Sequence, residues 1–223
     1  FDDNPVVFLE HRWLHNQEGD VPEGDVREPL GKAKLLHKGN DISIVSMSYM
    51  TVEALHAVEH METQGILCDV LDLRTISPLD WEMVFNSVKK TGRLLVLDTG
   101  VATGSVAGEI IARVSMELFS DLKQAPQRLT LPDFPTPTSP ALADNFYIRS
   151  EHIIQKVGNM MNKKFDYKII EYLWDLLGLI PDAVAEARNK YEKLNVHKNV
   201  VFNEDLGPIV LGHAPTKVLN AVK

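Results

Sequence analysis

The stretch Cys68-Asp69-Val70-Leu71-Asp72-Leu73-Arg74-Thr75-Ile76-Ser77-Pro78-Leu79-Asp80 decides the fold class of this 223-residue chain. Its first half belongs to an apolar run over residues 66–73 that predicts a buried strand. Its second half is a strand end leading into a helix start, with Pro78 where a helix can begin. Strand and helix patterns alternate in this way from residue 31 to residue 157. The alternation predicts an α/β fold, a three-layer α-β-α sandwich whose mostly parallel sheet is covered on both faces.

Outward from that stretch, hydrophobic spacing and breaker residues place the other elements. We expect strands at residues 42–47, 66–73, 94–97 and 127–131, the direction of the last being open. We expect helices capped by Thr51 and ended by Gly65, from Pro78 to Gly92, over residues 106–119, and capped by Ser150. Gly100 and Gly104 are expected to bracket a turn, and the four prolines of residues 132–140 predict an extended surface segment.

The two ends of the chain have a different pattern. Residues 5–10 are apolar and predict a strand, and the Gly, Pro and acidic residues of 16–29 predict an exposed linker. Beyond residue 164, helices over residues 169–178 and 181–194 and short strands at 199–202 and 208–211 predict a C-terminal helical extension.

Composition narrows the class of protein. The net charge is −8 and the pI is near 5.5, which argues against binding to nucleic acid or to an anionic membrane. The single cysteine, Cys68, excludes an internal disulfide framework and a multi-cysteine zinc site, and its apolar surroundings predict a buried, inert thiol. No apolar run reaches membrane-spanning length and no secretory signal is visible. Because the chain opens on Phe1, we expect a processed or truncated product.

Three residues just after the first expected strand are candidates for substrate binding: His11, Arg12 and His15. Loops at strand ends hold ligands in α/β proteins, Arg can bind a carboxylate or phosphate with two donors, and His can donate a hydrogen bond to a carbonyl. The alternative is a solvated loop with a packed Trp13. His11 and His15 have the spacing of metal ligands on a helix, but no zincin-type glutamate follows His11, so zinc is not expected.

Other polar residues favour structural roles. The turn at residues 99–105 lacks the lysine of a P-loop and the spacing of a dinucleotide fingerprint, so a plain turn is expected rather than a phosphate site. Asp98 and Glu109 flank it and are not expected to be catalytic. Asp80 is expected either to cap the following helix or to pair with Arg74. The chain has no Gly-x-Ser-x-Gly context, which argues against a hydrolase.

Several motifs occur in an order that is typical of one family: DNPVVFLEH (3–11), PLGKA (29–33), CDVLDLRTISPLD (68–80), TGRLLVLD (91–98) and PDFPTPTSPAL (132–142). With the strand-helix unit at residues 42–65, they resemble the beta subunit of the decarboxylating component of 2-oxo-acid dehydrogenases, in the transketolase superfamily. The resemblance covers residues 3–162.

This resemblance implies a C-terminal domain with a five-stranded sheet that has one antiparallel edge. It divides the chain into the end of a pyrimidine-binding domain and linker (1–30), a transketolase C-terminal-like domain (31–163) and an extension of unknown role (164–223). Such a domain supports dimerisation and shapes the mouth of the active site. The parent enzyme uses thiamine diphosphate and magnesium, which are held elsewhere, so we expect no cofactor on this chain and no activity from it alone.

For the site, the resemblance implies that Arg12, and less directly His11 and His15, meet the acidic group of the substrate. It implies a homodimer, or a heterotetramer with an alpha-type subunit, an acyltransferase core as a further partner, and a cytoplasmic or organellar-matrix location. Trp13 and His15 depart from the wording of a pyruvate-type enzyme, which leaves the substrate open. Two alternatives stay open: a transketolase-like transfer of ketol units, and an assembly or regulatory module without substrate contact.

Overall fold

The computed structural model describes residues 5, 7, 10–20, 22–139, 142–143 and 146–163, and the backbone of 200–203 and 207–210. The chain divides into two compact units. The first consists of Phe1–Pro135 and Tyr147–Phe165, and the second of Thr136–Phe146 and Asp166–Lys223.

The first unit is built on a five-stranded sheet in the order β1-β3-β2-β4-β5. The strands are β1 (Lys34–His37), β2 (Ile42–Ser46), β3 (Cys68–Asp72), β4 (Leu94–Val101) and β5 (Gln127–Leu131). β1 pairs with β3 antiparallel, and the other three pairs are parallel. The expected sheet is therefore confirmed, with its one antiparallel edge, and β5 runs parallel to β4.

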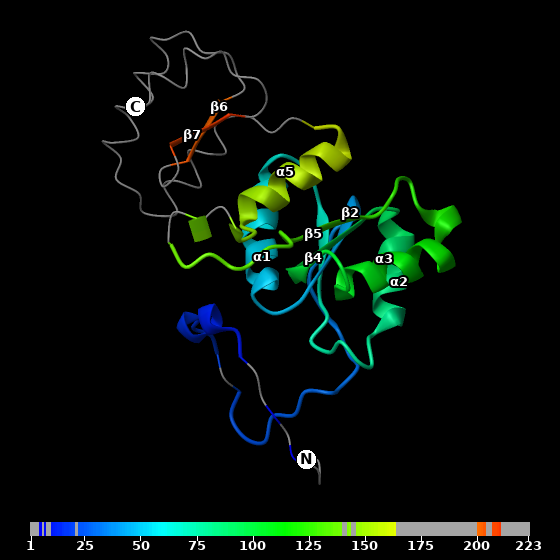
Figure 1. Ribbon diagram of the computed structural model, residues 1–223. Helices are drawn as coiled ribbons and strands as arrows, with labels where there is room; N and C mark the ends of the chain where they lie inside the picture. The colour runs from blue at the N-terminus through cyan, green and yellow to red at the C-terminus, as the bar shows by residue number, and fades with distance from the viewer. Residues whose placement is uncertain are drawn as a thin grey trace. The chain divides into compact units, whose positions relative to one another are not determined.

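Helices cover both faces of this sheet. Figure 1 shows α1 (Tyr49–Thr63) and α5 (Ser150–Met161) on one side and α2 (Trp81–Thr91) and α3 (Val106–Glu117) on the other. A short 3₁₀ helix, η2 (Phe119–Asp121), follows α3, and another, η1 (Arg12–Asn16), lies near the N-terminus. The three-layer sandwich expected from the alternation is confirmed.

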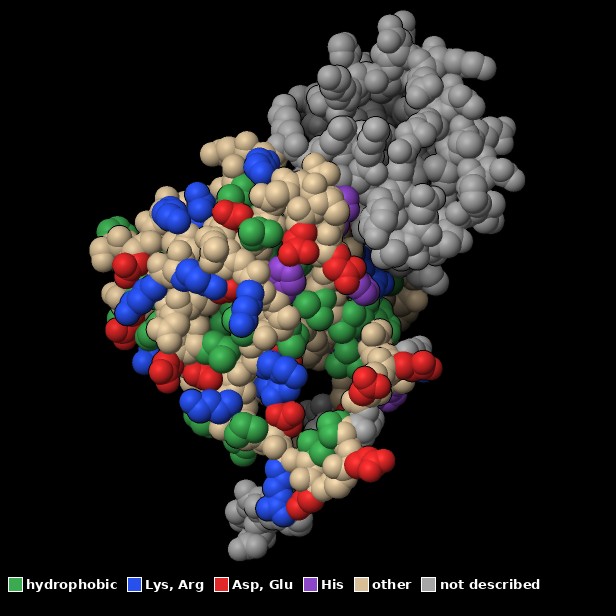
Figure 2. Space-filling view, turned by 180° about the vertical axis from the view of Figure 1, so that it is seen from behind, with side chains coloured by type: hydrophobic (Ala, Val, Ile, Leu, Met, Phe, Trp, Pro, Cys, Tyr) green, Lys and Arg blue, Asp and Glu red, His purple; other side chains and the backbone are tan. Residues whose placement is uncertain are grey.

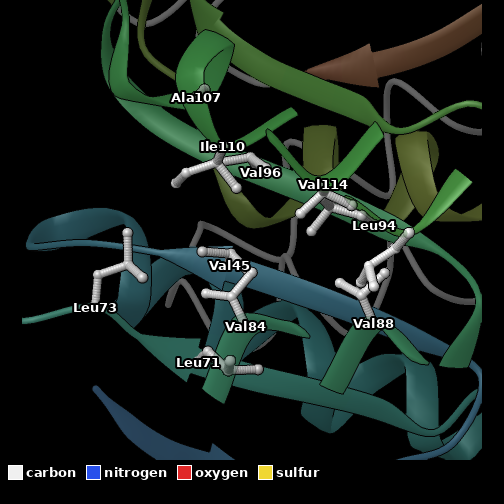
Figure 3. Close-up of a cluster of buried hydrophobic side chains, with 11 residues drawn as sticks. Val45, Leu71, Leu73, Val84, Val88, Leu94, Val96, Ala107, Ile110 and Val114 are labelled. Atoms are coloured by element: carbon white, nitrogen blue, oxygen red, sulfur yellow. The ribbon is translucent and has the colours of Figure 1, made fainter. Parts of the chain in front are cut away.

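The layer between the sheet and the α2 and α3 helices is mainly apolar, with buried hydroxyl groups of Ser43, Ser87 and Thr91 bonded to one another between β2 and α2. Figure 3 shows Val84 and Val88 of α2 and Ile110 and Val114 of α3 directed toward strand residues such as Val45. These side chains are 0% exposed. At about 25 cal/mol for each Å² of apolar surface removed from water, such packing is the main source of stability for the layer.

Several element boundaries differ from the sequence predictions. Thr51 lies inside α1 rather than at its N-cap, because its hydroxyl bonds to the Ser46 side chain (3.0 Å). α2 begins at Trp81, three residues after Pro78, since Asp80 is the N-cap and its Oδ1 accepts the Met83 N–H (3.2 Å). Ser150 is the first residue of α5, and Arg149 is its N-cap.

The β-strand predictions also differ from the structure in three places. β4 runs on to Val101, so Gly100 lies in the strand instead of opening a turn. The edge strand β1 was missed, because its four residues alternate only between exposed and half-buried. In the expected strand at residues 5–10, the described residues Pro5, Val7 and Glu10 are not in a strand, and the others lie outside the described part.

Other predictions are confirmed. Gly92 ends α2 with a left-handed backbone (φ 72°), and the described linker residues after Asn16 are exposed. Residues 132–139 form neither helix nor strand. In the second unit, β6 (Val200–Asn203) and β7 (Gly207–Val210) form an antiparallel pair close to the two expected strands. The helices expected at 169–178 and 181–194 lie outside the described residues.

The connection from β2 to α1 contains a strained residue. Ser48 has φ 55° and ψ −136°, a combination that Cβ contacts make unfavourable for any residue except glycine. It is exposed, and it stands at the carboxyl end of β2 immediately before α1.

We expect Ser48→Gly to raise the free energy of unfolding by about 1 kcal/mol, because glycine adopts this backbone geometry without the cost of a Cβ atom. Denaturant unfolding of the chain measures the difference. Ser48→Ala is the matched control, since alanine also lacks the hydroxyl but keeps the Cβ. Equal stability of the Gly and Ala variants would refute the strain.

Candidate functional site

His11 is the one predicted substrate residue that the fold draws into a packed cluster. It caps η1, where its Nδ1 accepts the Trp13 N–H at 3.3 Å. Its ring stacks on the Tyr49 ring, with centroids 5.2 Å apart and an interplanar angle of 10°. His11 therefore joins η1 to the first residue of α1.

Arg12 and His15 remain exposed. The His15 Nε2 lies 2.9 Å from the Glu10 carboxylate, with both side chains 55% exposed, a pair of small energetic weight. Among the described residues, none forms a hydrogen bond or an ion pair with the Arg12 side chain. The structure thus places the three predicted residues at one short element, with no partner for the Arg12 side chain among the described residues.

Trp13 is packed, as one of the sequence alternatives predicted. Its ring meets the rings of Tyr49 and Tyr147 edge to face, at centroid distances of 4.9 and 4.7 Å. The Arg149 guanidinium lies over the same ring, 4.4 Å from its centroid, in a cation–π geometry. We call His11, Trp13, Tyr49, Tyr147 and Arg149 the Trp13 cluster.

Beneath the cluster lies a nearly buried carboxylate. Glu53 of α1 is 5% exposed. Its Oε2 accepts the Ser150 N–H at 2.8 Å, and its Oε1 accepts the Tyr49 hydroxyl at 2.5 Å and lies 3.4 Å from the Arg149 Nη1. Glu53 thereby binds the start of α5 to α1 and balances its charge with Arg149.

The same surroundings change the acidity of Tyr49. Burial, together with the hydrogen bond to Glu53 and its negative charge, raises the pKa of Tyr49 to about 12. Tyr49 is therefore a neutral hydrogen-bond donor at physiological pH, and it serves to orient Glu53 rather than to exchange protons.

The cluster lies where ligands bind in open α/β sheets. The chain passes from β2 to β3 in one direction and then returns across β2 to β4, so the strand order reverses between β2 and β4. Ligands of such sheets lie beyond the carboxyl ends of the strands at the point of reversal. Tyr49 follows the carboxyl end of β2 by three residues, which puts the Trp13 cluster at this edge.

Asp72, at the carboxyl end of β3, is a second polar group on this edge. Burial raises the pKa of Asp72, against the opposing effect of Arg74. The Thr51 hydroxyl donates to its carboxylate at 3.4 Å. Arg74 also pairs with Glu28 in the linker. Arg74 therefore does not pair with Asp80, and of the two roles expected for Asp80 the helix cap is the correct one.

The turn after β4 is structural, as expected. The Asp98 carboxylate accepts the N–H groups of Gly100 (2.8 Å) and Ala107 (3.1 Å), and the Ser105 hydroxyl accepts the Gly108 N–H (3.2 Å). Two of the donors that a phosphate would use at the start of α3, the N–H groups of Ala107 and Gly108, are thus already occupied. Glu109 is exposed and has no described contact with Asp98.

An open groove runs along α2 beside β1 and β3, and its lining includes Lys32, Asp69 and Lys90. Its two nearly buried carboxylates, Asp69 and Asp80, are hydrogen-bonded within the domain. The Asp69 carboxylate accepts from the Gly39 N–H, the Ser87 hydroxyl and the Lys90 Nζ, at 2.6–2.9 Å. We regard this groove as structural, because its carboxylates Asp69 and Asp80 already accept hydrogen bonds from the domain itself.

The remaining groups do not suggest another site. Burial raises the pKa of Cys68 to about 12, so its thiol is inert, as predicted. Among the described residues, no group of three or more His, Cys, Asp or Glu side chains could hold a metal. No helix in that part has the length and hydrophobicity to cross a membrane. Figure 2 shows one face of the protein, on which Lys and Arg side chains are interspersed with Asp and Glu.

Tyr49, Glu53 and Arg149 were not identified from the sequence. Glu53 carried a usable signal, since it lies three residues after Met50 and four before Ala57, on the buried stripe of α1. A charged residue on such a stripe requires a buried partner. The partners Arg149 and Ser150 are about a hundred residues away, and only the fold brings them together.

Comparison with known proteins agrees with this fold. The chain is 41% identical over 149 residues to the acetoin:2,6-dichlorophenolindophenol oxidoreductase subunit beta of Cupriavidus necator, covering 67% of this chain and 44% of the relative. It is 37% identical over 161 residues to the pyruvate dehydrogenase E1 component subunit beta of Porphyra purpurea, covering 72% and 49%. The chain spans about half the length of these curated relatives.

A solved structure has the same fold. The split gene transketolase described as an inactive beta4 tetramer superposes with a TM-score of 0.55 at 24% identity, over 66% of this chain and 48% of that one. Residues 31–153 match the family model described as the transketolase C-terminal domain. That match spans more than half of the chain, and the chain therefore belongs to the transketolase C-terminal domain family.

Proposed function

We propose that this chain is the C-terminal part of the beta subunit of a thiamine-diphosphate enzyme that decarboxylates a 2-oxo acid and transfers the acyl unit. The observation that supports it is the continuous similarity, at 37–41% identity, to beta subunits named for pyruvate dehydrogenase and acetoin oxidoreductase. The transketolase structure, at 24% identity, supports the fold only.

We place the thiamine diphosphate and its magnesium in another part of the assembled enzyme. A bound diphosphate needs free backbone N–H donors and a metal held by carboxylate or amide oxygens. At the start of α3, the N–H groups of Ala107 and Gly108 already bond to Asp98 and Ser105. The described residues there therefore do not fit a diphosphate.

The role we assign to this chain is to form a wall of the substrate channel. η1 carries Arg12 at the ligand edge of the sheet, and the Arg12 guanidinium has no partner among the described residues. A guanidinium binds a carboxylate through two parallel hydrogen bonds, which suits the acidic group of a 2-oxo acid. His11 and His15 already have partners within the chain, so they support the segment more than they contact the substrate.

We also propose that the chain contributes to association with a second copy and to a heterotetramer with an alpha-type subunit. Met116 of α3 and Phe119 of η2 are 82% and 80% exposed, which is unusual for large apolar side chains close to each other in sequence. Sedimentation of the complete subunit tests the role of Met116 and Phe119. In the Phe119→Asp variant, the monomer–dimer equilibrium should shift toward monomer, because a charge replaces an apolar contact. The same dimer content in wild type and variant would refute this surface.

The proposed reaction is tested on the complete beta subunit assembled with its partner subunit. With thiamine diphosphate, magnesium and a 2-oxo acid, we expect release of carbon dioxide and reduction of an artificial electron acceptor. Ketol transfer between sugars without decarboxylation would instead establish the transketolase-like alternative.

In that enzyme, Arg12→Ala should raise the KM for the 2-oxo acid by roughly 10- to 100-fold, the factor that corresponds to losing a hydrogen-bonded contact to a charged group. Lys89→Ala is the control, because Lys89 is an exposed cation on α2 whose removal changes the net charge equally. An unchanged KM for Arg12→Ala would refute the binding role of Arg12.

A further inference from the structure

The position of η1 depends on contacts outside η1 itself. This 3₁₀ helix has five residues and two described backbone hydrogen bonds around it, Leu14 N–H to His11 O (2.9 Å) and Gln17 N–H to Leu14 O (3.1 Å). Such short helices are marginal by themselves. The described linker residues that follow are exposed. The packing of Trp13, together with the stacking of His11 on Tyr49, therefore holds the segment against the domain.

Arg149 is the polar part of that packing. Its guanidinium covers the Trp13 ring on one side, and its Nη1 donates to the Tyr49 hydroxyl at 2.9 Å. The Arg149 side chain is 33% exposed, whereas the side chain of its carboxylate partner, Glu53, is 7% exposed. Arg149 thus links Trp13, which precedes the domain, to the junction of α1 and α5.

We propose that Arg149 is a positioning residue for substrate binding: through Trp13 it holds η1, and with it Arg12, at the ligand edge of the sheet. The inference rests on the proposed function, in which Arg12 binds the acidic group of the substrate. Arg12 neighbours Trp13 in sequence. If the Trp13 ring moves, the backbone of Arg12 therefore moves with it, and the Arg12 guanidinium is displaced. An anion bound by two parallel hydrogen bonds tolerates little such freedom.

Removal of the Arg149 side chain takes away the charge that balances Glu53 but leaves its other hydrogen bonds. Glu53 would still accept the Ser150 N–H and the Tyr49 hydroxyl, so it would remain hydrogen-bonded. Replacement of Glu53 itself would uncap α5 and disturb the whole α1–α5 layer. Arg149→Met is therefore the informative variant, and Arg149→Lys, which keeps the cation, is its conservative partner.

The test is a double-mutant cycle in the complete, assembled enzyme. Arg149→Met should raise the KM for the 2-oxo acid roughly three- to tenfold with little change in kcat, the range expected from loss of a cation–π contact. Arg149→Lys should restore most of the affinity. In the double variant Arg12→Ala/Arg149→Met, KM should equal that of Arg12→Ala alone, because Arg149 acts only through Arg12.

Lys90→Met is the matched control. Lys90 also pairs with a nearly buried carboxylate, Asp69, at 2.7 Å, but in the last turn of α2, near the amino end of β3. The Lys90→Met variant should leave the KM for the 2-oxo acid unchanged. Hydrogen exchange of the peptide that covers residues 11–17 gives a second readout, which should be faster in Arg149→Met and unchanged in Lys90→Met.

The outcomes separate the two levels of the inference. If Arg12→Ala raises KM but Arg149→Met does not, or if the two effects simply multiply, the positioning role is refuted and the proposed function stands. Unchanged hydrogen exchange in Arg149→Met also refutes it. If Arg12→Ala itself leaves KM unchanged, the binding role of Arg12 fails, and the positioning role fails with it.

Discussion

Burial of the parallel sheet on both faces is the constraint on which the first unit depends. The strands β2, β3 and β4 are almost wholly buried, on both faces of the sheet. α2 and α3 cover one face and α1 and α5 the other, so only the edges remain for contacts with ligands (Figure 1). At the carboxyl edge, the start of α1 meets the chain that precedes the domain.

Glu53 connects that constraint to the candidate site. α5 follows β5 by eighteen residues of chain, and its first N–H must find an acceptor when it packs beside α1. Glu53 supplies the acceptor, and its remaining oxygen fixes Tyr49 and approaches Arg149. Glu53 thus orients Tyr49 and Arg149, which surround Trp13, and also joins α5 to α1.

The sheet could be predicted because its central strands are marked by short patterns in the neighbouring sequence. Apolar runs such as residues 66–73 and breakers such as Gly92 act within a few neighbours, so the central strands and the end of α2 were placed correctly. β1 was missed because an edge strand buries little and carries a weak pattern. Thr51 and Ser150 were misplaced as caps because Ser48 starts α1 with a strained backbone and Glu53 caps α5 from another helix.

The site could be predicted only in part. The loop that carries His11, Arg12 and His15 was identified from residue types and from the family resemblance, and the packing of Trp13 was one of the alternatives. Arg149 could not be found, since it is more than a hundred residues from Trp13 and both are ordinary in their local sequence. Long-range pairs of this kind follow from the order of the strands and not from any short motif.

The central claim is that this chain is a scaffold and channel wall for a reaction whose coenzyme is held elsewhere in the enzyme. Titration calorimetry with thiamine diphosphate and magnesium tests it most directly, on the 223-residue chain and on the complete assembly. We expect saturable binding to the complete assembly and no binding heat with the chain alone. Saturable binding of thiamine diphosphate by the chain alone would contradict it.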